Sequence, residues 1–157
     1  MLGLAALACR TTLEDEDQAV QRTCRILETA PCTDAKSHAD LAWLEENVFK
    51  PGCIAGSCHD GTGGDQAAKL DLRAGMARAH LVNVPSKLEP DHLLVAAGQP
   101  SASYLLMMVQ QIRPEDMTPP ASPPPADVGF MPQTSPEPLC CQKLDALERW
   151  IAMGAPN

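Results

Sequence analysis

Large aromatic side chains are scarce in this sequence of 157 residues, which holds two Trp, one Tyr and two Phe. Pro and Gly are plentiful, with 15 and 10 residues. A chain that is short of large core side chains and rich in loop formers predicts a small core with long irregular connections. The length fits one compact domain.

Positive charge is also scarce, because 12 Lys and Arg face 20 Asp and Glu and leave a formal net charge of −8. This balance argues against binding to nucleic acid or to an anionic membrane surface. An acidic surface suits a protein partner with a basic docking face, or solubility alone.

Long hydrophobic runs are missing beyond residues 1–9, which are apolar and end in Cys9. This run is too short to span a bilayer, and it is similar to the end of a bacterial secretory signal that precedes a lipid-modified Cys9. The acidic residues 10–37 are then expected to form a solvated tether, and residues 38–157 the folded domain. Seven cysteines indicate an oxidising compartment.

Cys53, Cys58 and His59 form the motif C-x4-C-H. Two thiols followed by an imidazole can hold a haem, because each thiol adds across a vinyl group and the imidazole binds the iron. The usual spacer has two residues, and here Gly56 and Ser57 ease the longer loop, since glycine tolerates positive φ. A Cys53–Cys58 disulfide is the main alternative, and a zinc or copper site with further ligands is another.

Three helical segments are expected in the domain. Apolar periodicity predicts a helix over 38–50 that Pro51 ends, a helix that starts at Ser101 and ends before Pro114, and a terminal helix over 139–153. Residues 114–138 hold nine prolines and are expected to be an extended loop. The fold class is therefore all-α, with three to four helices and long Pro/Gly-rich loops.

A second axial ligand for an iron at His59 would have to come from elsewhere in the chain. Met131 is the first candidate, because the proline-braced loop around it can hold a thioether in place at low entropy cost. Met117, in the same loop, is the second candidate. His80 and His92 are further possibilities, although a lone histidine is more often exposed or hydrogen-bonded.

Cys24, Cys32, Cys140 and Cys141 remain outside the motif. Neighbouring cysteines rarely bond each other, so a bridge from Cys140 or Cys141 to Cys24 or Cys32 would fix the N-terminal segment to the core. Four thiols allow three pairings, and the sequence does not choose among them.

The order of motifs resembles a small class I c-type cytochrome domain, and more closely the cytochrome-c-like domains of planctomycetes and myxobacteria. The resemblance covers about residues 40–157. The residues that carry it are Cys53, Cys58, His59, Gly61, Leu70-Asp71-Leu72, 81–86, 98–105, Met131-Pro132, Pro138-Leu139 and 150–156.

That resemblance implies one covalent haem c with His59 as proximal and Met131 as distal iron ligand. It implies single-electron transfer with redox protein partners in the periplasm or at the cell surface. An electron carrier is favoured over an enzyme such as a peroxidase, because no acid/base pair is evident. The alternative function is a haem-free, disulfide-stabilised exported binding module with the same fold.

Overall fold

The computed structural model describes residues 24–63, 69–133 and 139–157. Its regular structure consists of helical segments of α, 3-10 and π type, with β-structure in the described ranges limited to isolated bridges. The elements are α1 (Ala30–Asp34), η1 (Ala35–Ser37), α2 (Leu41–Leu44), η2 (Glu45–Ile54), η3 (Ala55–Ser57), α3 (Ala77–Leu81), η5 (Pro100–Ala102), α4 (Tyr104–Met108), η6 (Pro114–Asp116) and α5 (Cys141–Ala152). The predicted all-α class is confirmed.

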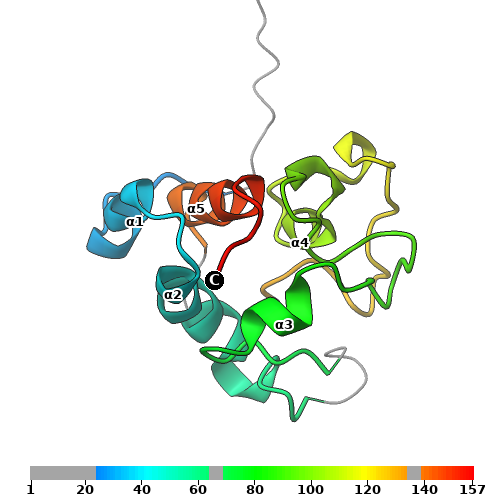
Figure 1. Ribbon diagram of the computed structural model, residues 1–157, viewed down its shortest axis with the longest axis horizontal. Coiled ribbons are helices and arrows are strands. Elements are labelled where there is room, and N and C mark those ends of the chain that lie inside the picture. Colours follow the sequence, from blue (N-terminus) through cyan, green and yellow to red (C-terminus); the bar gives the residue numbers. More distant parts are fainter. Residues whose placement is uncertain (1–23, 64–68, 134–138) are drawn as a thin grey trace, which may run out of the picture.

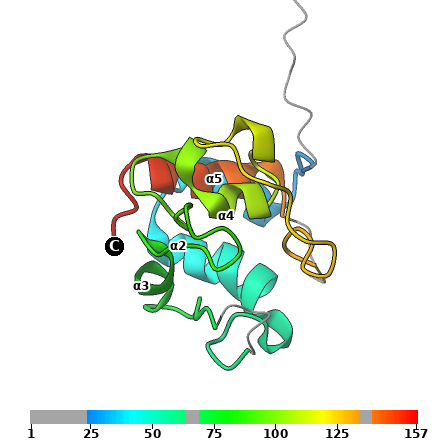
Figure 2. The ribbon, with the colours of Figure 1, turned by 90° about the vertical axis from the view of Figure 1, so that its right-hand side faces the viewer.

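The terminal helix α5 is the element around which the others are arranged. It packs against η1, α2 and η5. Figure 1 shows α1 and α2 on one side of α5 and α4 on the other, and the orthogonal view places α4 and α5 above α2 and α3 (Figure 2).

Helix α5 forms where the sequence predicts it. One face is apolar and fully buried, and it carries Leu144, Leu147, Trp150 and Ile151. The helix ends at Ala152, and Gly154, two residues later, has a left-handed φ of 93°. There the amide of Gly154 donates to the carbonyl of Ile151 (2.9 Å) and the amide of Ala155 to that of Trp150 (3.0 Å), which is the Schellman arrangement that glycine permits.

The first core helix differs from the prediction at both ends. It begins at Leu41, because the carboxylate of Asp40 accepts the amide of Trp43 (2.9 Å) and caps the helix. It also continues through Pro51 to Ile54 as the π-helical segment η2, instead of ending at Pro51. Proline removes one backbone hydrogen bond, and its ring crowds the preceding turn of an α-helix; the wider π turn relieves that crowding, so the winding does not stop here.

The helix predicted to start at Ser101 is also shorter and later than expected. Residues 100–102 form the 3-10 turn η5, and α4 begins after Ser103 and ends at Met108, well before Pro114. The buried hydroxyl of Ser103 accepts the amide of Ala96 (3.0 Å) and donates to the carbonyl of Gln99 (2.9 Å). Ser103 therefore joins α4 to residues four and seven positions earlier in the preceding loop, a role that apolar periodicity does not indicate.

Replacing Ser103 by alanine is expected to lower the free energy of unfolding by about 1–3 kcal/mol, because the buried amide of Ala96 loses its acceptor. Ser101→Ala is the matched control. Ser101 is exposed, so its replacement should change stability by less than about 0.5 kcal/mol. Urea unfolding followed by tryptophan fluorescence measures both. A larger loss for Ser101→Ala than for Ser103→Ala would contradict the assignment of this anchoring role to Ser103.

Part of the predicted tether is folded. Residues 24–37 include α1 and η1, and the disulfides Cys24–Cys141 and Cys32–Cys140 bind this segment to the start of α5. Of the three possible pairings, the structure contains this one. The predicted signal segment, Cys9 and the rest of the tether lie outside the described residues. No helix in the described part of the chain is long and apolar enough to cross a membrane.

Two groups of buried side chains form the core. The first core cluster lies between α2, η2, α3 and α5 and includes Leu44, Val48, Phe49, Leu81, Leu144, Leu147, Trp150 and Ile151. The second core cluster consists of Tyr104, Met107, Met108 and Met117. Residues 114–133, called the proline-rich segment below, provide Met117 and cover this second cluster through Val128 and Phe130.

Candidate functional site

The C-x4-C-H motif begins inside the last turn of η2 and folds back on itself. Cys53 lies in η2, and the spacer continues as η3. Gly56 adopts a left-handed φ of 73°, as the sequence predicts for glycine in the longer spacer, and Ser57 is also left-handed with a φ of 59°. The amide of His59 then donates to the carbonyl of Cys53 (3.1 Å), so the two ends of the motif are closed by a backbone hydrogen bond.

Both thiols of the motif are free, so the structure does not contain the alternative Cys53–Cys58 disulfide. Cys53 is half-buried beside the first core cluster, whereas Cys58 is exposed. Burial, and next the charge of a neighbouring Cys58 thiolate, raise the pKa of the Cys53 thiol to about 12. Cys53 is therefore protonated at neutral pH, which makes it a poor nucleophile for thiol–disulfide exchange.

The backbone on either side of His59 is held by the segment that contains Leu70 and Leu72. The carbonyl of His59 accepts the amide of Leu72 (2.9 Å), and the amide of Gly61 donates to the carbonyl of Leu70 (3.0 Å). Leu72 is buried in the first core cluster. The position of His59 is thus fixed to the core through two hydrogen bonds and one buried side chain.

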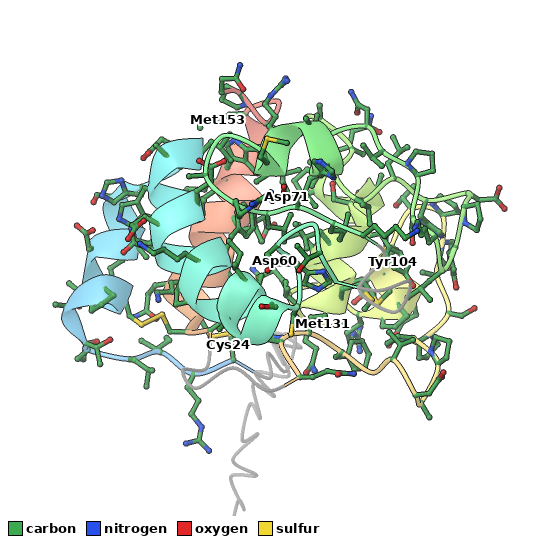
Figure 3. The ribbon with its side chains drawn as sticks, turned by 90° about the horizontal axis from the view of Figure 1, so that it is seen from below. Cys24, Asp60, Asp71, Tyr104, Met131 and Met153 are labelled. Carbon is green, nitrogen blue, oxygen red and sulfur yellow. A yellow bond between two sulfur atoms is a disulfide. The ribbon has the colours of Figure 1, made fainter. Side chains whose placement is uncertain are left out.

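Asp60 and Asp71 form an isolated antiparallel bridge between these two segments, and Figure 3 shows the two residues on neighbouring stretches of the chain. A Cβ atom on Gly61 would lie 3.0 Å from a carboxylate oxygen of Asp71. Gly61 also has a φ of 81°. Space and conformation both require glycine at this position.

Arg73 holds the buried carboxylate of Asp71 with two side-chain hydrogen bonds, from Nε (2.9 Å) and Nη2 (2.6 Å), and its amide donates a third (3.1 Å). This hydrogen bonding lowers the pKa of Asp71 to about 2. The sequence analysis included the Leu-Asp-Leu pattern but did not predict a role for Arg73. The only indication in the sequence is that Arg73 follows Asp71 by two residues.

The Asp71–Arg73 pair predicts a specific loss of stability in acid. Because the folded-state pKa lies below the ordinary value of about 4, the ionised carboxylate stabilises the fold above pH 4, and this contribution is lost as pH falls from about 4 to about 2. Asp71→Asn should therefore unfold at lower temperature at pH 7 and depend less on pH in that window. Thermal unfolding at several pH values measures both effects.

The matched control for the acid experiment is Asp116→Asn, which removes a carboxylate that pairs with Arg113 on the exposed surface. An exposed pair is screened by solvent and contributes little, so this variant should follow the wild-type pH curve. Parallel curves for Asp71→Asn and wild type would show that Asp71 does not carry the acid dependence.

The two candidate methionines lie in different environments. Met131 is half-buried and packs against both core clusters, and its amide donates to the carbonyl of Met108 (2.7 Å). Met117 is 3% exposed and belongs to the second core cluster. Cys53 also borders the first core cluster, so Met131 and Cys53 contact the same group of buried side chains. Figure 3 marks Met131 in the view from below.

The two histidines that the sequence left open are also described. His80 is half-buried in α3. His92 is 4% exposed; its Nε2 lies 3.3 Å from a carboxylate oxygen of Glu89, and its Nδ1 has no hydrogen-bond partner in the described part of the chain. Its ring lies beside that of Tyr104, with centroids 5.8 Å apart.

The residues of the motif fit a covalent haem by the chemistry of their donor set. Two unpaired thiols lie ahead of an imidazole, and a partly exposed thioether borders the same core cluster as the first thiol. In contrast, no group of three or more His, Cys, Asp or Glu side chains suited to a metal ion gathers within the described ranges. A zinc or copper site thus finds no supporting ligand cluster there.

Fold and site together define a small α-helical protein with two disulfides and one motif that keeps its thiols free. No family model matches the chain, and neither a curated protein nor a solved structure is significantly similar to it.

Proposed function

We propose that the chain is a monohaem c-type cytochrome that transfers single electrons outside the cytoplasm. The observation that carries this proposal is the pair of free thiols, Cys53 and Cys58, directly ahead of His59, in a structure whose other described cysteines are bridged. A haem c bound there supplies an iron that gains and loses one electron.

Each residue of the site has a separate task in this proposal. Cys53 and Cys58 hold the haem by thioether bonds, and His59 holds the iron from the proximal side. The hydrogen bonds of the His59 backbone to Leu72 and Cys53 orient the motif on the core. Met131 would provide the second side-chain ligand of the iron. With two ligands from the chain, a bound haem would serve electron transfer and not substrate binding, so the proposal is a carrier and not an enzyme.

The proposed location follows from the same cysteines. Two disulfides form in an oxidising compartment, which is also where haem c is attached, so the periplasm or the cell surface suits the protein. Cys9 would carry a lipid anchor there. The net charge of −8 favours redox partners with a basic docking face.

The deciding experiment is the intact mass of the protein after export from a host that attaches haem c. We expect a mass gain of one haem, together with the reduced α-band of a c-type haem. The double variant Cys53→Ser/Cys58→Ser is the control and should gain no haem. A wild-type mass without an added haem, with Cys53 and Cys58 as thiols, from the same host would contradict the proposal.

One observation favours a second candidate, a haem-free and disulfide-stabilised exported binding module. The largest core side chains, Trp150, Tyr104 and Phe49, are already covered by protein atoms, so the described core is closed without a cofactor. In the same mass experiment this candidate predicts no haem and, if Cys53 and Cys58 join, a further loss of two hydrogens.

A further inference from the structure

The proline-rich segment has few groups with which to attach itself to the rest of the protein. Residues 119–125 read Pro-Pro-Ala-Ser-Pro-Pro-Pro, and prolines have no amide hydrogen to donate. Only Ala121 and Ser122 carry one. The amide of Ala121 donates to the carbonyl of Pro114 within the segment (2.9 Å), so Ser122 provides the amide that can bind outside it.

That amide binds a carboxylate on another loop. Ser122 donates to Oε1 of Glu89 (2.8 Å), across 33 residues of sequence. The second oxygen of Glu89 lies 3.3 Å from Nε2 of His92, which is buried beside the ring of Tyr104. Tyr104 is in α4 and belongs to the second core cluster. A single carboxylate therefore connects the proline-rich segment to a buried imidazole and, through it, to α4.

The other outward attachments of the segment lie on both sides of this link. The amide of Thr118 donates to the carbonyl of Ser101 (2.8 Å), and the amide of Met131 to that of Met108 (2.7 Å). Within the described residues between Thr118 and Met131, the Glu89–Ser122 bond is the one hydrogen bond from the segment to another part of the fold. Without it, twelve residues between Thr118 and Met131 would rely on apolar contact alone.

We propose that Glu89 is a positioning residue that holds the proline-rich segment against α4 and thereby sets the position of Met131. The effect on chemistry rests on the proposed function, because the position of Met131 matters only when its sulfur binds a haem iron. The link itself is a property of the chain alone.

The first test uses hydrogen exchange of the full chain without haem. In Glu89→Ala the amide of Ser122 should exchange about tenfold faster than in wild type, because its hydrogen bond to a charged acceptor is lost. The amide of Met131, which donates to the carbonyl of Met108, should also exchange about tenfold faster, because the segment that holds Met131 is released. Amides of α5 should be unchanged. Glu89→Gln keeps an oxygen acceptor and should restore most of the protection. Glu115→Ala, on the exposed side of η6, is the matched control.

The second test uses haem-loaded protein and the absorption that reports a bond between the iron and the sulfur of Met131. Glu89→Ala should weaken the methionine-ligated signature and shift it toward high spin, whereas Glu89→Gln should retain it. If the amides of Ser122 and Met131 exchange at the wild-type rate in Glu89→Ala, the proposal is overturned. It is also overturned if their exchange becomes faster but the iron spectrum of this variant stays the same as in wild type. If the wild type takes up no haem, the proposed function fails, and hydrogen exchange alone decides whether Glu89 holds the segment.

Discussion

Removing both disulfides is expected to unfold the protein at room temperature, whereas removing either one is not. The bridged cysteines are 117 and 108 residues apart, so a chain with only one bridge closes a loop of more than 100 residues. Loop-closure entropy assigns about 5 kcal/mol to such a bridge. That is comparable with the whole stability of many domains.

The second bridge contributes less because the first has already brought the two ends together. With Cys24–Cys141 formed, Cys32–Cys140 closes a loop of only about ten residues, for which the same estimate is about 3 kcal/mol. The two bridges are therefore not additive. Each single-bridge variant should lose about 3 kcal/mol, and the variant with neither bridge should lose about 8 kcal/mol.

Guanidinium unfolding followed by the fluorescence of Trp43 and Trp150 measures the losses of the two single-bridge variants, and the fluorescence without denaturant shows whether the variant with neither bridge is unfolded. The variants are Cys24→Ser/Cys141→Ser, Cys32→Ser/Cys140→Ser and the combination of the two. A control with Cys53→Ser/Cys58→Ser removes two cysteines without removing a bridge and should stay close to wild type in the haem-free protein. Losses that simply add across the two bridges would contradict this account.

Met131→Ala and Met117→Ala are expected to have opposite effects on spectrum and stability. Met117 is 3% exposed within the second core cluster, so its truncation should cost about 2–4 kcal/mol of stability. Met131 is half-buried, so its truncation should cost less. In haem-loaded protein, however, Met131→Ala should convert the iron to a high-spin form, and Met117→Ala should leave the spectrum unchanged.

Absorption spectroscopy and thermal unfolding of the same samples separate the two effects. Met76→Ala is the matched control, because Met76 is 41% exposed and should affect neither quantity. A spectral change in Met117→Ala with none in Met131→Ala would transfer the axial position to Met117. It would also require that residue to leave a packed cluster.

The sequence predicted α5 well because its signals are local and consistent. A helical apolar stripe, a glycine at the C-terminal end and a following proline all indicate the same boundaries, and the structure places the helix at Cys141–Ala152. The C-x4-C-H motif was found for the same reason, since its three residues are adjacent or nearly so. The left-handed Gly56 was likewise a local expectation.

The misplaced boundaries come from interactions that no local pattern contains. Pro51 signals a helix end, yet the π winding of η2 accommodates it. Ser101 has the appearance of a helix cap, yet Ser103 makes the bonds that matter, to residues of the preceding loop. In the proline-rich segment, the link between Ser122 and Glu89 joins residues 33 positions apart, so sequence periodicity does not indicate it.

The pairing of the cysteines has a consequence for biosynthesis. A chain made from its N-terminus exposes Cys24 and Cys32 long before Cys140 and Cys141, their partners, have been made. During that interval Cys24 and Cys32 can bond to each other. Cys53 and Cys58 are also closer along the chain than the native partners, and a premature bond to either would consume the motif. Correct maturation therefore depends on keeping early thiols reduced, or on reshuffling wrong pairs, until the last helix has reached the oxidising compartment.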